Sequence, residues 1–438
     1  MSLLIKDGLI VADPLRGECV QGSLLLHGDR VAAVGRDAPA NRADVLDAAG
    51  CWVLPGLVDA HTHLYGALAT GMPLKADPPQ NFPQILERIW WRLDKALQPE
   101  DVRYSGYIGG IASLLSGITT IFDHHASPSC PAGSLSILAE VVQTLGLRAS
   151  LAYEVSDRDG PASRDAGIAE NRDFFLRCQR ANDPMLKAHF GIHAVFSVSD
   201  ATMRRCAEVG RSIGAGFHLH VLEHRPELEK FSAEHAGLSV VEFLENVGIL
   251  GARTIAAHTV HVGPADAERF ARTGTHTVHN PRSNMGNGVG VSPVPLLLRA
   301  GVSACLGSDG FYDMPLQMAL APALQNLSQG NPSAMGGGDA LKMVYGNNAA
   351  LAEQTFGLPF GRLTPGCAAD VLVIPYDPAT PAHAGNLGAH ILAALAGGPR
   401  DVIVGGVLRV RGRRVLAVEA AQINARAREL AGALWQRL

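Results

Sequence analysis

Short apolar runs alternate with polar loops and longer amphipathic stretches through the middle of this chain. The stretches between the runs, such as DVRYSGYIGGIASLLSG and LSILAEVVQTLG, have the apolar spacing of helices. Eight strands that alternate with helices over roughly 300 residues are typical of a (β/α)₈ barrel, a TIM-like α/β fold. The strands are expected at residues 52–61, 118–125, 147–155, 185–195, 214–221, 254–260, 275–280 and 302–309.

The two ends of the chain have a different pattern. Residues 1–57 and the segment after 361 consist of short β-rich runs, separated by glycine, aspartate and proline. Neither segment alone supplies enough strands to cover its own apolar face. We therefore expect a small discontinuous β-sandwich from residues 1–57 and 361–438, and a catalytic barrel domain from residues 58–360.

Residues 65–100 follow the first barrel strand and include an amphipathic helix, QNFPQILERIWWRLDKAL. Loops after barrel strands surround the active site of such folds. The insertion is predicted either to close over a ligand as a lid or to pack outside the barrel through Trp90 and Trp91. The sequence pattern leaves both alternatives open.

Composition narrows the class of protein. With 438 residues, 47% of them hydrophobic and 18% charged, the chain has enough apolar material for a large core. A net charge of −4 gives no general attraction to nucleic acid or to an anionic membrane, and no apolar run reaches the length of about 18 residues that spans a bilayer. The seven cysteines form no CxxC pair, and MSLLIKDGLIVADP is expected to be a strand, not a signal peptide. We expect a cytoplasmic protein without nucleic-acid or membrane partners.

Polar residues that can bind a metal close several of the apolar runs. Because the carboxyl ends of barrel strands meet at one face, these side chains are expected to gather there. Two histidines at alternate positions of one strand point to the same side. Three imidazoles and a carboxylate suit a divalent ion such as zinc or iron, and a spare carboxylate can carry protons. The residues concerned are His61, His63, His220, Glu223, His258 and Asp309.

The same motifs resemble those of the amidohydrolase superfamily. LPGLVDAHTH is similar to its first-strand pattern PGxVDxHxH, and HLHVLEH, AAHTVHV and LGSDG are similar to later motifs of its mononuclear deaminase and chlorohydrolase branch. DHHASP, WWRLDKAL and HNPRSNMGNGVG most resemble the SsnA group of aminohydrolases. The resemblance implies a homodimer that holds one zinc or iron ion per chain, on His61, His63, His220 and Asp309.

The resemblance also implies a division of catalytic labour, which elementary chemistry supports. A divalent ion lowers the pKa of bound water toward about 7. Glu223, which is not needed as a ligand, would protonate a ring nitrogen of the substrate. His258 would orient the attacking water and stabilise the developing oxyanion, and Asp309 would pass the proton of that water to departing ammonia. We expect hydrolytic deamination of a nitrogen heterocycle of the purine, pterin, pyrimidine or triazine type.

Other functions stay open at this stage. A chlorohydrolase or a cyclic amide hydrolase uses the same metal chemistry with a different leaving group. A non-catalytic scaffold is a third alternative, which the presence of all six motif residues disfavours. The sequence contains no Walker A motif, no GxSxG elbow, no GxGxxG after a strand and no cytidine-deaminase signature. A nucleotide cofactor and a serine nucleophile are therefore not indicated.

The residues predicted to contact a substrate lie at other strand ends. His193 ends the fourth strand, and of the adjacent His124 and His125 after the second strand, the contact is assigned to His125. Asn284 lies in the polar loop after the seventh strand, where asparagine also favours turns. The rival metal site has two ions bridged by a carboxylated Lys187, but this lysine lies near the start of its strand.

Overall fold

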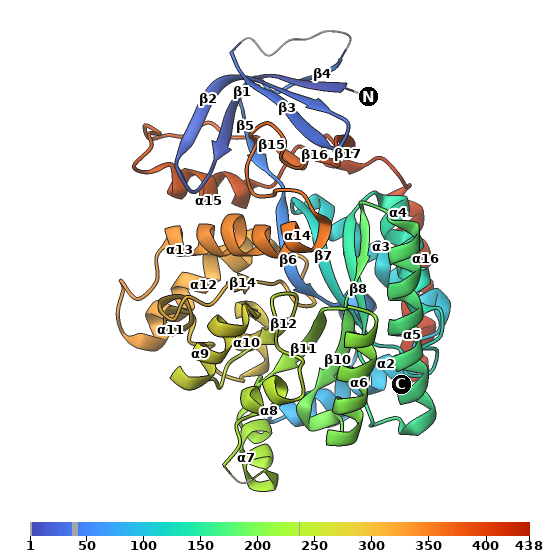
Figure 1. Ribbon diagram of the computed structural model, residues 1–438. Helices are drawn as coiled ribbons and strands as arrows, with labels where there is room; N and C mark the ends of the chain where they lie inside the picture. Colours follow the sequence, from blue (N-terminus) through green and yellow to red (C-terminus); the bar gives the residue numbers. More distant parts are fainter. Residues whose placement is uncertain (1, 37–42, 236) are drawn as a thin grey trace.

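The computed structural model describes residues 2–36, 43–235 and 237–438 (Figure 1). A barrel of parallel strands surrounded by helices forms the larger part of the molecule. A β-sheet domain, in which the first and last strands of the chain lie together, caps the amino end of the barrel (Figure 1). The expected fold class, a barrel with a β domain built from both ends of the chain, is confirmed.

The barrel consists of two parallel sheets, β6-β7-β8-β9 and β10-β11-β12-β13-β14. Backbone bridges from Val155 to Ile192 and from Thr62 to Asp309 join the two sheets, so the strand order closes on itself. The strands are β6 (Leu57–Thr62), β7 (Ile118–His125), β8 (Arg148–Tyr153), β9 (Leu186–Ala188), β10 (Phe190–Ala194), β11 (Phe217–Val221), β12 (Ile255–His258), β13 (His276–His279) and β14 (Ala304–Leu306).

Two of the strands predicted from the sequence are divided. The run at 52–61 breaks at Gly56 into β5 (Cys51–Pro55), which belongs to the β domain, and β6 of the barrel. Gly56 packs so closely on Thr119 that a Cβ atom would overlap the threonine side chain. The run at 185–195 breaks at His189, because β9 pairs with β8 while β10 pairs with β11.

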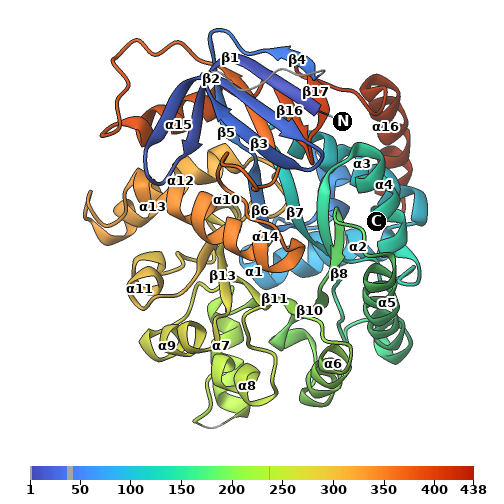
Figure 2. The same cartoon turned by 45° about the horizontal axis from the view of Figure 1, so that its top comes forward.

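Helices cover the outside of the barrel (Figure 2). Their inward faces supply fully buried side chains such as Leu138, Val142 and Phe270. Within the described residues, no helix combines the length and the apolar character needed to cross a membrane. The helices are α3 (Pro99–Leu115), α4 (Ser134–Leu145), α5 (Gly160–Ala181), α6 (Asp200–Ser212), α7 (Arg225–Glu234), α8 (Val240–Asn246), α9 (Pro264–Thr273), α10 (Pro281–Asn287), α11 (Val294–Arg299), α12 (Met314–Gln329), α13 (Gly337–Leu341), η4 (Lys342–Asn348) and α14 (Ala349–Phe356), with the short turn η3 (Val195–Ser197).

The β domain is one sheet in the order β18-β17-β16-β15-β5-β1-β2-β3, with β4 also paired to β1. Most pairs are antiparallel, but β1 runs parallel to β4 and β5. A separate core of buried side chains, among them Ile5, Leu24 and Val371, lies within this domain. The strands are β1 (Ser2–Asp13), β2 (Glu18–His27), β3 (Arg30–Gly35), β4 (Asp44–Asp47), β15 (Val371–Pro375), β16 (Asp401–Val404), β17 (Val407–Arg411) and β18 (Arg414–Val415). Helix α15 (Leu387–Gly397) lies between β15 and β16 in the chain, and helix α16 (Ala420–Gln436) follows β18.

The domain boundaries expected at 57/58 and 360/361 stay a prediction. Residues 1 and 37–42 of the first segment lie outside the described residues. Helix α16, although it lies within the expected sandwich segment, packs on α3 of the barrel. Trp435 at its end donates from Nε1 to the carbonyl oxygen of Leu68 at 3.0 Å. The last helix therefore ties the end of the chain to the insertion after β6.

That insertion folds into four short helices: η1 (Leu64–Ala69), α1 (Phe82–Ile85), η2 (Leu86–Trp90) and α2 (Trp91–Ala96). Side chains from all four line a cavity at the carboxyl end of the barrel. The insertion therefore lies over the strand ends, and Trp90 and Trp91 face the cavity. Its opening and closing as a lid stays a prediction.

Candidate metal centre and active site

The side chains that end β6, β11 and β14 come together at the carboxyl face of the barrel. Ring nitrogens of His61, His63 and His220 lie within 4.8 Å of one another. Nε2 of His63 lies 3.2 Å from Nε2 of His220 and 3.4 Å from Oδ1 of Asp309. Ligand atoms held at about 2.0–2.1 Å from a tetrahedral ion lie about 3.3–3.4 Å from each other. The pairs His63–His220 and His63–Asp309 therefore have the spacing expected between two ligands of one small divalent ion.

Hydrogen bonds to backbone carbonyls set the proton positions of two of these rings. Nδ1 of His63 faces the carbonyl oxygen of His124 at 2.6 Å, and Nδ1 of His220 faces that of His193 at 2.9 Å. Because a carbonyl only accepts, both Nδ1 atoms carry a proton and both Nε2 atoms point at each other. Two nitrogen lone pairs at this distance repel each other unless a proton or a metal ion lies between them.

The electrostatics of the three rings favour a cation at this point. Burial, reinforced by the neighbouring imidazoles, holds the pKa values of His61 and His220 well below their usual range, so both stay neutral. Burial opposes a charge on His63 as well, but Glu154 and Asp309 raise the pKa of His63 to about 10. Nε2 of His61 is buried and has no hydrogen-bond partner among the described residues. Neutral imidazoles and one exchangeable proton fit a divalent metal.

Asp59, from the VDAH motif, holds the eighth strand end in place. Its carboxylate accepts a hydrogen bond from the backbone amide of Ser308 at 2.9 Å and another from the Ser308 hydroxyl. The next residue, Asp309, lies in the left-handed region with φ 55°, as does His258 with φ 71°. Strained backbone of this kind persists only where the surroundings enforce it, and it is common at active sites. Asp59 thereby fixes the direction of the Asp309 side chain.

Glu223 lies next to His258, beside the predicted metal ligands. Its Oε1 lies 3.7 Å from Nδ1 of His258 and accepts a hydrogen bond from Nδ2 of Asn287 at 3.5 Å. Burial, followed by the negative charges of Asp309 and Glu227, raises the pKa of Glu223 well above its usual range. This shift favours the protonated form of the carboxyl group, which can donate its proton to a substrate.

His258 lies between Glu223 and Asp309. Nε2 of His258 is 3.9 Å from Oδ2 of Asp309, and Nδ1 donates to Oδ1 of Asn284 at 2.9 Å. Burial lowers the pKa of His258, so its unprotonated Nε2 points toward the metal ligands. Asn284 is fully buried behind the ring and does not line the cavity. Its position makes it the partner of His258.

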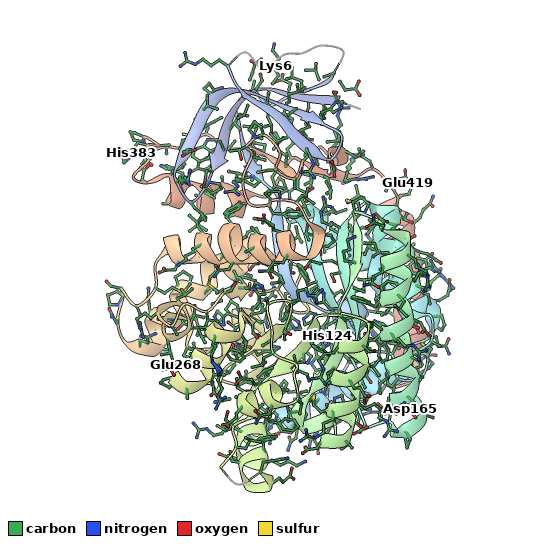
Figure 3. The ribbon with its side chains drawn as sticks, in the orientation of Figure 1. Lys6, His124, Asp165, Glu268, His383 and Glu419 are labelled. Carbon is green, nitrogen blue, oxygen red and sulfur yellow. The ribbon has the colours of Figure 1, made fainter. Side chains whose placement is uncertain are left out.

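Of the remaining predicted residues, some line the cavity and others do not. His193 lines the cavity, and its Nδ1 bonds the hydroxyl of Ser197 at 2.7 Å. His125 does not line it: its Nε2 bonds the hydroxyl of Ser127 at 2.9 Å. His124, labelled over the middle of the barrel in Figure 3, is fully buried, and one of its ring nitrogens lies within 4.8 Å of those of His61, His63 and His220. Lys187 lies in the middle of the short strand β9, where it is half-buried.

The cavity has a volume of about 380 Å³ and opens next to the metal ligands. A volume of this order suits a small organic ligand. Four charged residues in its wall, Asp94, Glu154, Arg158 and Arg282, were not singled out in the sequence. For Glu154, the sequence did contain a signal: a charged residue near the end of the apolar run LRASLAYEV indicates a side chain at the carboxyl end of a barrel strand. Large apolar side chains cover the rest of the wall: Tyr65, Phe82, Leu86, Trp90, Trp91, Phe196 and Phe311.

Comparisons with known proteins agree with this site. The chain is 30% identical over 437 residues to a 5-methylthioadenosine/S-adenosylhomocysteine deaminase of Desulforudis audaxviator, and the aligned region covers 96% of this chain and 96% of the relative. It is 29% identical to a 5'-deoxyadenosine deaminase of Methanosarcina acetivorans, over 98% of this chain and 97% of the relative.

Solved structures share the fold. A zinc-bound adenosine deaminase from Xanthomonas campestris superposes with a TM-score of 0.85 at 23% identity, covering 99% of this chain and 98% of the other. The zinc complex of atrazine chlorohydrolase from Arthrobacter aurescens TC1 gives 0.81 at 22% identity, covering 98% and 100%. The sequence model of the Amidohydrolase family matches residues 52–415. The superfamily predicted from the motifs is confirmed: this chain is an enzyme of the Amidohydrolase family.

Proposed function

We propose that this protein is a mononuclear zinc-dependent aminohydrolase, which replaces the exocyclic amine of a nitrogen heterocycle by oxygen from water. One observation carries the proposal. Facing imidazole nitrogens and the carboxyl group of Glu223, whose pKa burial raises, border the same cavity of about 380 Å³. Relatives along nearly the whole chain carry the names of deaminases, and two structural neighbours contain zinc.

The residues divide into ligands and proton carriers. His61, His63, His220 and Asp309 would hold the ion, which supplies a water molecule of lowered pKa when bound. The protonated carboxyl of Glu223 donates to the ring nitrogen next to the reacting carbon, which makes that carbon more electrophilic. His258, whose Nδ1 proton is held by Asn284, accepts a hydrogen bond at Nε2 from the attacking water and orients it. Asp309 lies close enough to His258 to take up the proton of that water.

The protons balance in this assignment. Water adds its oxygen to the carbon, and the bond from that carbon to the exocyclic nitrogen breaks. The amine departs as ammonia after it receives the proton that Asp309 accepted, the hydroxyl group of the adduct gives its proton to Glu223, and the ring nitrogen keeps the proton that Glu223 donated. The product is the oxo heterocycle, and both carboxyl groups regain their starting states.

The chlorohydrolase alternative differs only in the leaving group. Chloride leaves as an anion and needs no proton, whereas an amine leaves only after protonation. Two carboxyl groups that border the attacked position, Glu223 and Asp309, therefore favour an amine. The same proton supply would also serve a cyclic amide hydrolase, which the screen below distinguishes by its ring-opened product.

Two broader features belong to the proposal. The cysteines of the described chain are free, which fits the reducing cytoplasm. A homodimer and the absence of nucleic-acid or membrane partners follow from the family resemblance and from the net charge of −4.

An ammonia-release screen with zinc-loaded protein tests the proposal. Amino-substituted purines, pterins, pyrimidines and triazines are the substrates, and chloro-substituted triazines and cyclic amides serve as comparison. We expect ammonia from at least one amino heterocycle and a fall in kcat of about 10²–10⁴-fold in Glu223→Gln. The exposed Glu229 on α7 provides the control variant Glu229→Gln, which should keep full activity. Chloride release or ring opening without ammonia would contradict the proposal.

A further inference from the structure

The cavity has a second charged region, made by Asp94, Glu154 and Arg158, which the proposed chemistry does not use. Asp94 comes from helix α2 of the insertion, and Glu154 and Arg158 follow strand β8. Strand β8 lies three strands away from β14, which carries Asp309, in the order around the barrel. We call the three residues together the polar wall. Its Glu154 borders the metal centre, with Oε1 3.3 Å from Nδ1 of His63, whereas Asp94 and Arg158 pair with each other and are placed to meet the part of the ligand that does not react.

The polar wall is buried and internally paired. Nη2 of Arg158 lies 2.5 Å from Oδ2 of Asp94, whose side chain is only 2% exposed. The guanidinium of Arg158 also lies over the ring of Trp91, at 5.2 Å from its centre. These contacts hold both charges at the cavity without the freedom of surface side chains. The polar wall is therefore an ordered part of the cavity lining.

Several hydrogen-bonding atoms of the wall are left without partners among the described residues. They include Nη1 of Arg158, while Nε of Arg158 lies 3.4 Å from Oδ2 of Asp159. Beside the wall, the indole Nε1 of Trp91 is also unpartnered. The acceptor Oδ1 of Asp94 is also unpartnered, whereas Oε1 of Glu154 lies 3.3 Å from Nδ1 of His63 and 3.4 Å from Nδ1 of His124. A buried charged group with unmet hydrogen bonds is costly, and such groups at a cavity are usually completed by what binds there. The ligand that completes this wall must both accept and donate.

The arrangement of charge excludes some partners. Asp94 and Asp159 both form ion pairs with the guanidinium of Arg158, and Glu154 adds a third carboxyl group, so a phosphate or carboxylate substituent at Arg158 would meet more negative than positive charge. A vicinal diol is best held by both oxygens of one carboxylate, but Oδ2 of Asp94 already bonds Arg158. A carbonyl group next to a ring N–H fits better, because the carbonyl accepts from Arg158 while the N–H donates to Asp94 or Glu154.

We infer that the polar wall recognises the lactam edge of an oxo-substituted amino heterocycle, with the C=O group on Arg158 and the adjacent N–H on a wall carboxylate. This inference rests on the proposed deaminase function and narrows its substrate class. The amine to be removed points at the metal centre, and the lactam edge points away from it. Ring systems without an oxo group leave the charged wall unsatisfied and bind weakly.

Matched compounds test the inference on the zinc-loaded protein. Guanine and 2-aminopurine differ by the 6-oxo group and its N–H, and isocytosine and 2-aminopyrimidine differ in the same way. Binding is measured on the Glu223→Gln variant by fluorescence of 2-aminopurine and its displacement, and by calorimetry for the pyrimidines. We expect the oxo member of at least one pair to bind about 100-fold more tightly or better, since each hydrogen bond to a charged group contributes about 10-fold or more. Equal affinities in both pairs, or no measurable binding of either oxo compound, would overturn the inference.

Substitution of Arg158 tests the residue itself. In the Glu223→Gln background, Arg158→Lys keeps the charge but loses the fork of donors, and we expect the preference for the oxo compound to fall at least 10-fold. Arg172→Met, on the exposed face of α5, is the arginine control and should keep the preference. Zinc content and thermal unfolding of each variant report whether the fold is intact. A preference that Arg158→Lys leaves unchanged would refute the role of the wall.

The two proposals fail in different ways. Oxo preference in binding together with no ammonia release from any compound by the unsubstituted protein would refute the deaminase function and keep the lactam-edge site. Rapid release of ammonia from adenosine, with no oxo preference in either pair, would keep the deaminase function and refute the lactam-edge site.

Discussion

Asn284 offers a sharp test of how the site controls His258. Its Oδ1 accepts the Nδ1 proton of His258 at 2.9 Å, and both side chains are almost completely buried. Asn284→Ala leaves that N–H without a partner, which costs about 1–3 kcal/mol for a buried donor. The ring is then free to move its proton to Nε2 and can no longer accept from the attacking water. We expect kcat to fall about 10–100-fold, with KM changed much less.

Asn284→Asp keeps the hydrogen bond and adds a negative charge. Since burial now lowers the pKa of His258, a carboxylate at this position would raise it again. The imidazolium form has no lone pair at Nε2 and cannot accept a hydrogen bond. As the pH falls, the variant should therefore lose activity at a higher pH than the unsubstituted enzyme. The assay is the pH profile of kcat/KM for the best substrate of the ammonia screen, measured with zinc content checked in each variant.

The alternative role of Asn284 gives the opposite pattern. If Asn284 contacts the substrate directly, as its loop suggested in the sequence, Asn284→Ala should raise KM, and Asn284→Asp should leave the acid limb of the pH profile where it was. That result would refute the reasoning from the structure. Asn331→Ala, in an exposed loop, is a control for the substitution and should behave like the unsubstituted enzyme.

Three further outcomes can be measured. His193→Ala should keep zinc and lower kcat/KM at least 10-fold, about 1.4 kcal/mol, whereas unchanged kinetics with lower thermal stability would show a purely structural role. Zinc binding should release about one proton below pH 10, because the pKa of His63 is about 10 without metal. Zinc affinity should therefore fall as the pH falls. Calorimetry in buffers of different ionisation enthalpy measures this proton, and zinc binding without proton release would contradict the prediction. Asp370→Asn should lower the free energy of unfolding by about 3–5 kcal/mol in chemical denaturation. The reason is that the fully buried guanidinium of Arg148, which lies 3.1 Å from Asp370, loses its counter-charge. A change below about 1 kcal/mol would contradict this.

The sequence alone determined which residues could meet at the metal centre. His61 and His63 alternate along one strand, and His220 and Asp309 end later strands of the same parallel barrel. Because alternation is a local property and every barrel strand ends at the same face, the motif order is enough to predict that these side chains converge. The structure brings these four side chains together, and the fold class and family were predicted on the same grounds.

Only the tertiary structure decided which neighbour of a pair faces the ligand and what completes the cavity. His124 and His125 are equivalent in the sequence, but the twist and packing of β7 turn His124 into the barrel and His125 toward Ser127. Asp94 and Arg158 are 64 positions apart and belong to different segments, yet they form one buried pair. No periodicity links such residues, because their contact depends on where an insertion settles over the strand ends. Long-range packing of this kind sets the shape and charge of the cavity, and hence its choice of ligand.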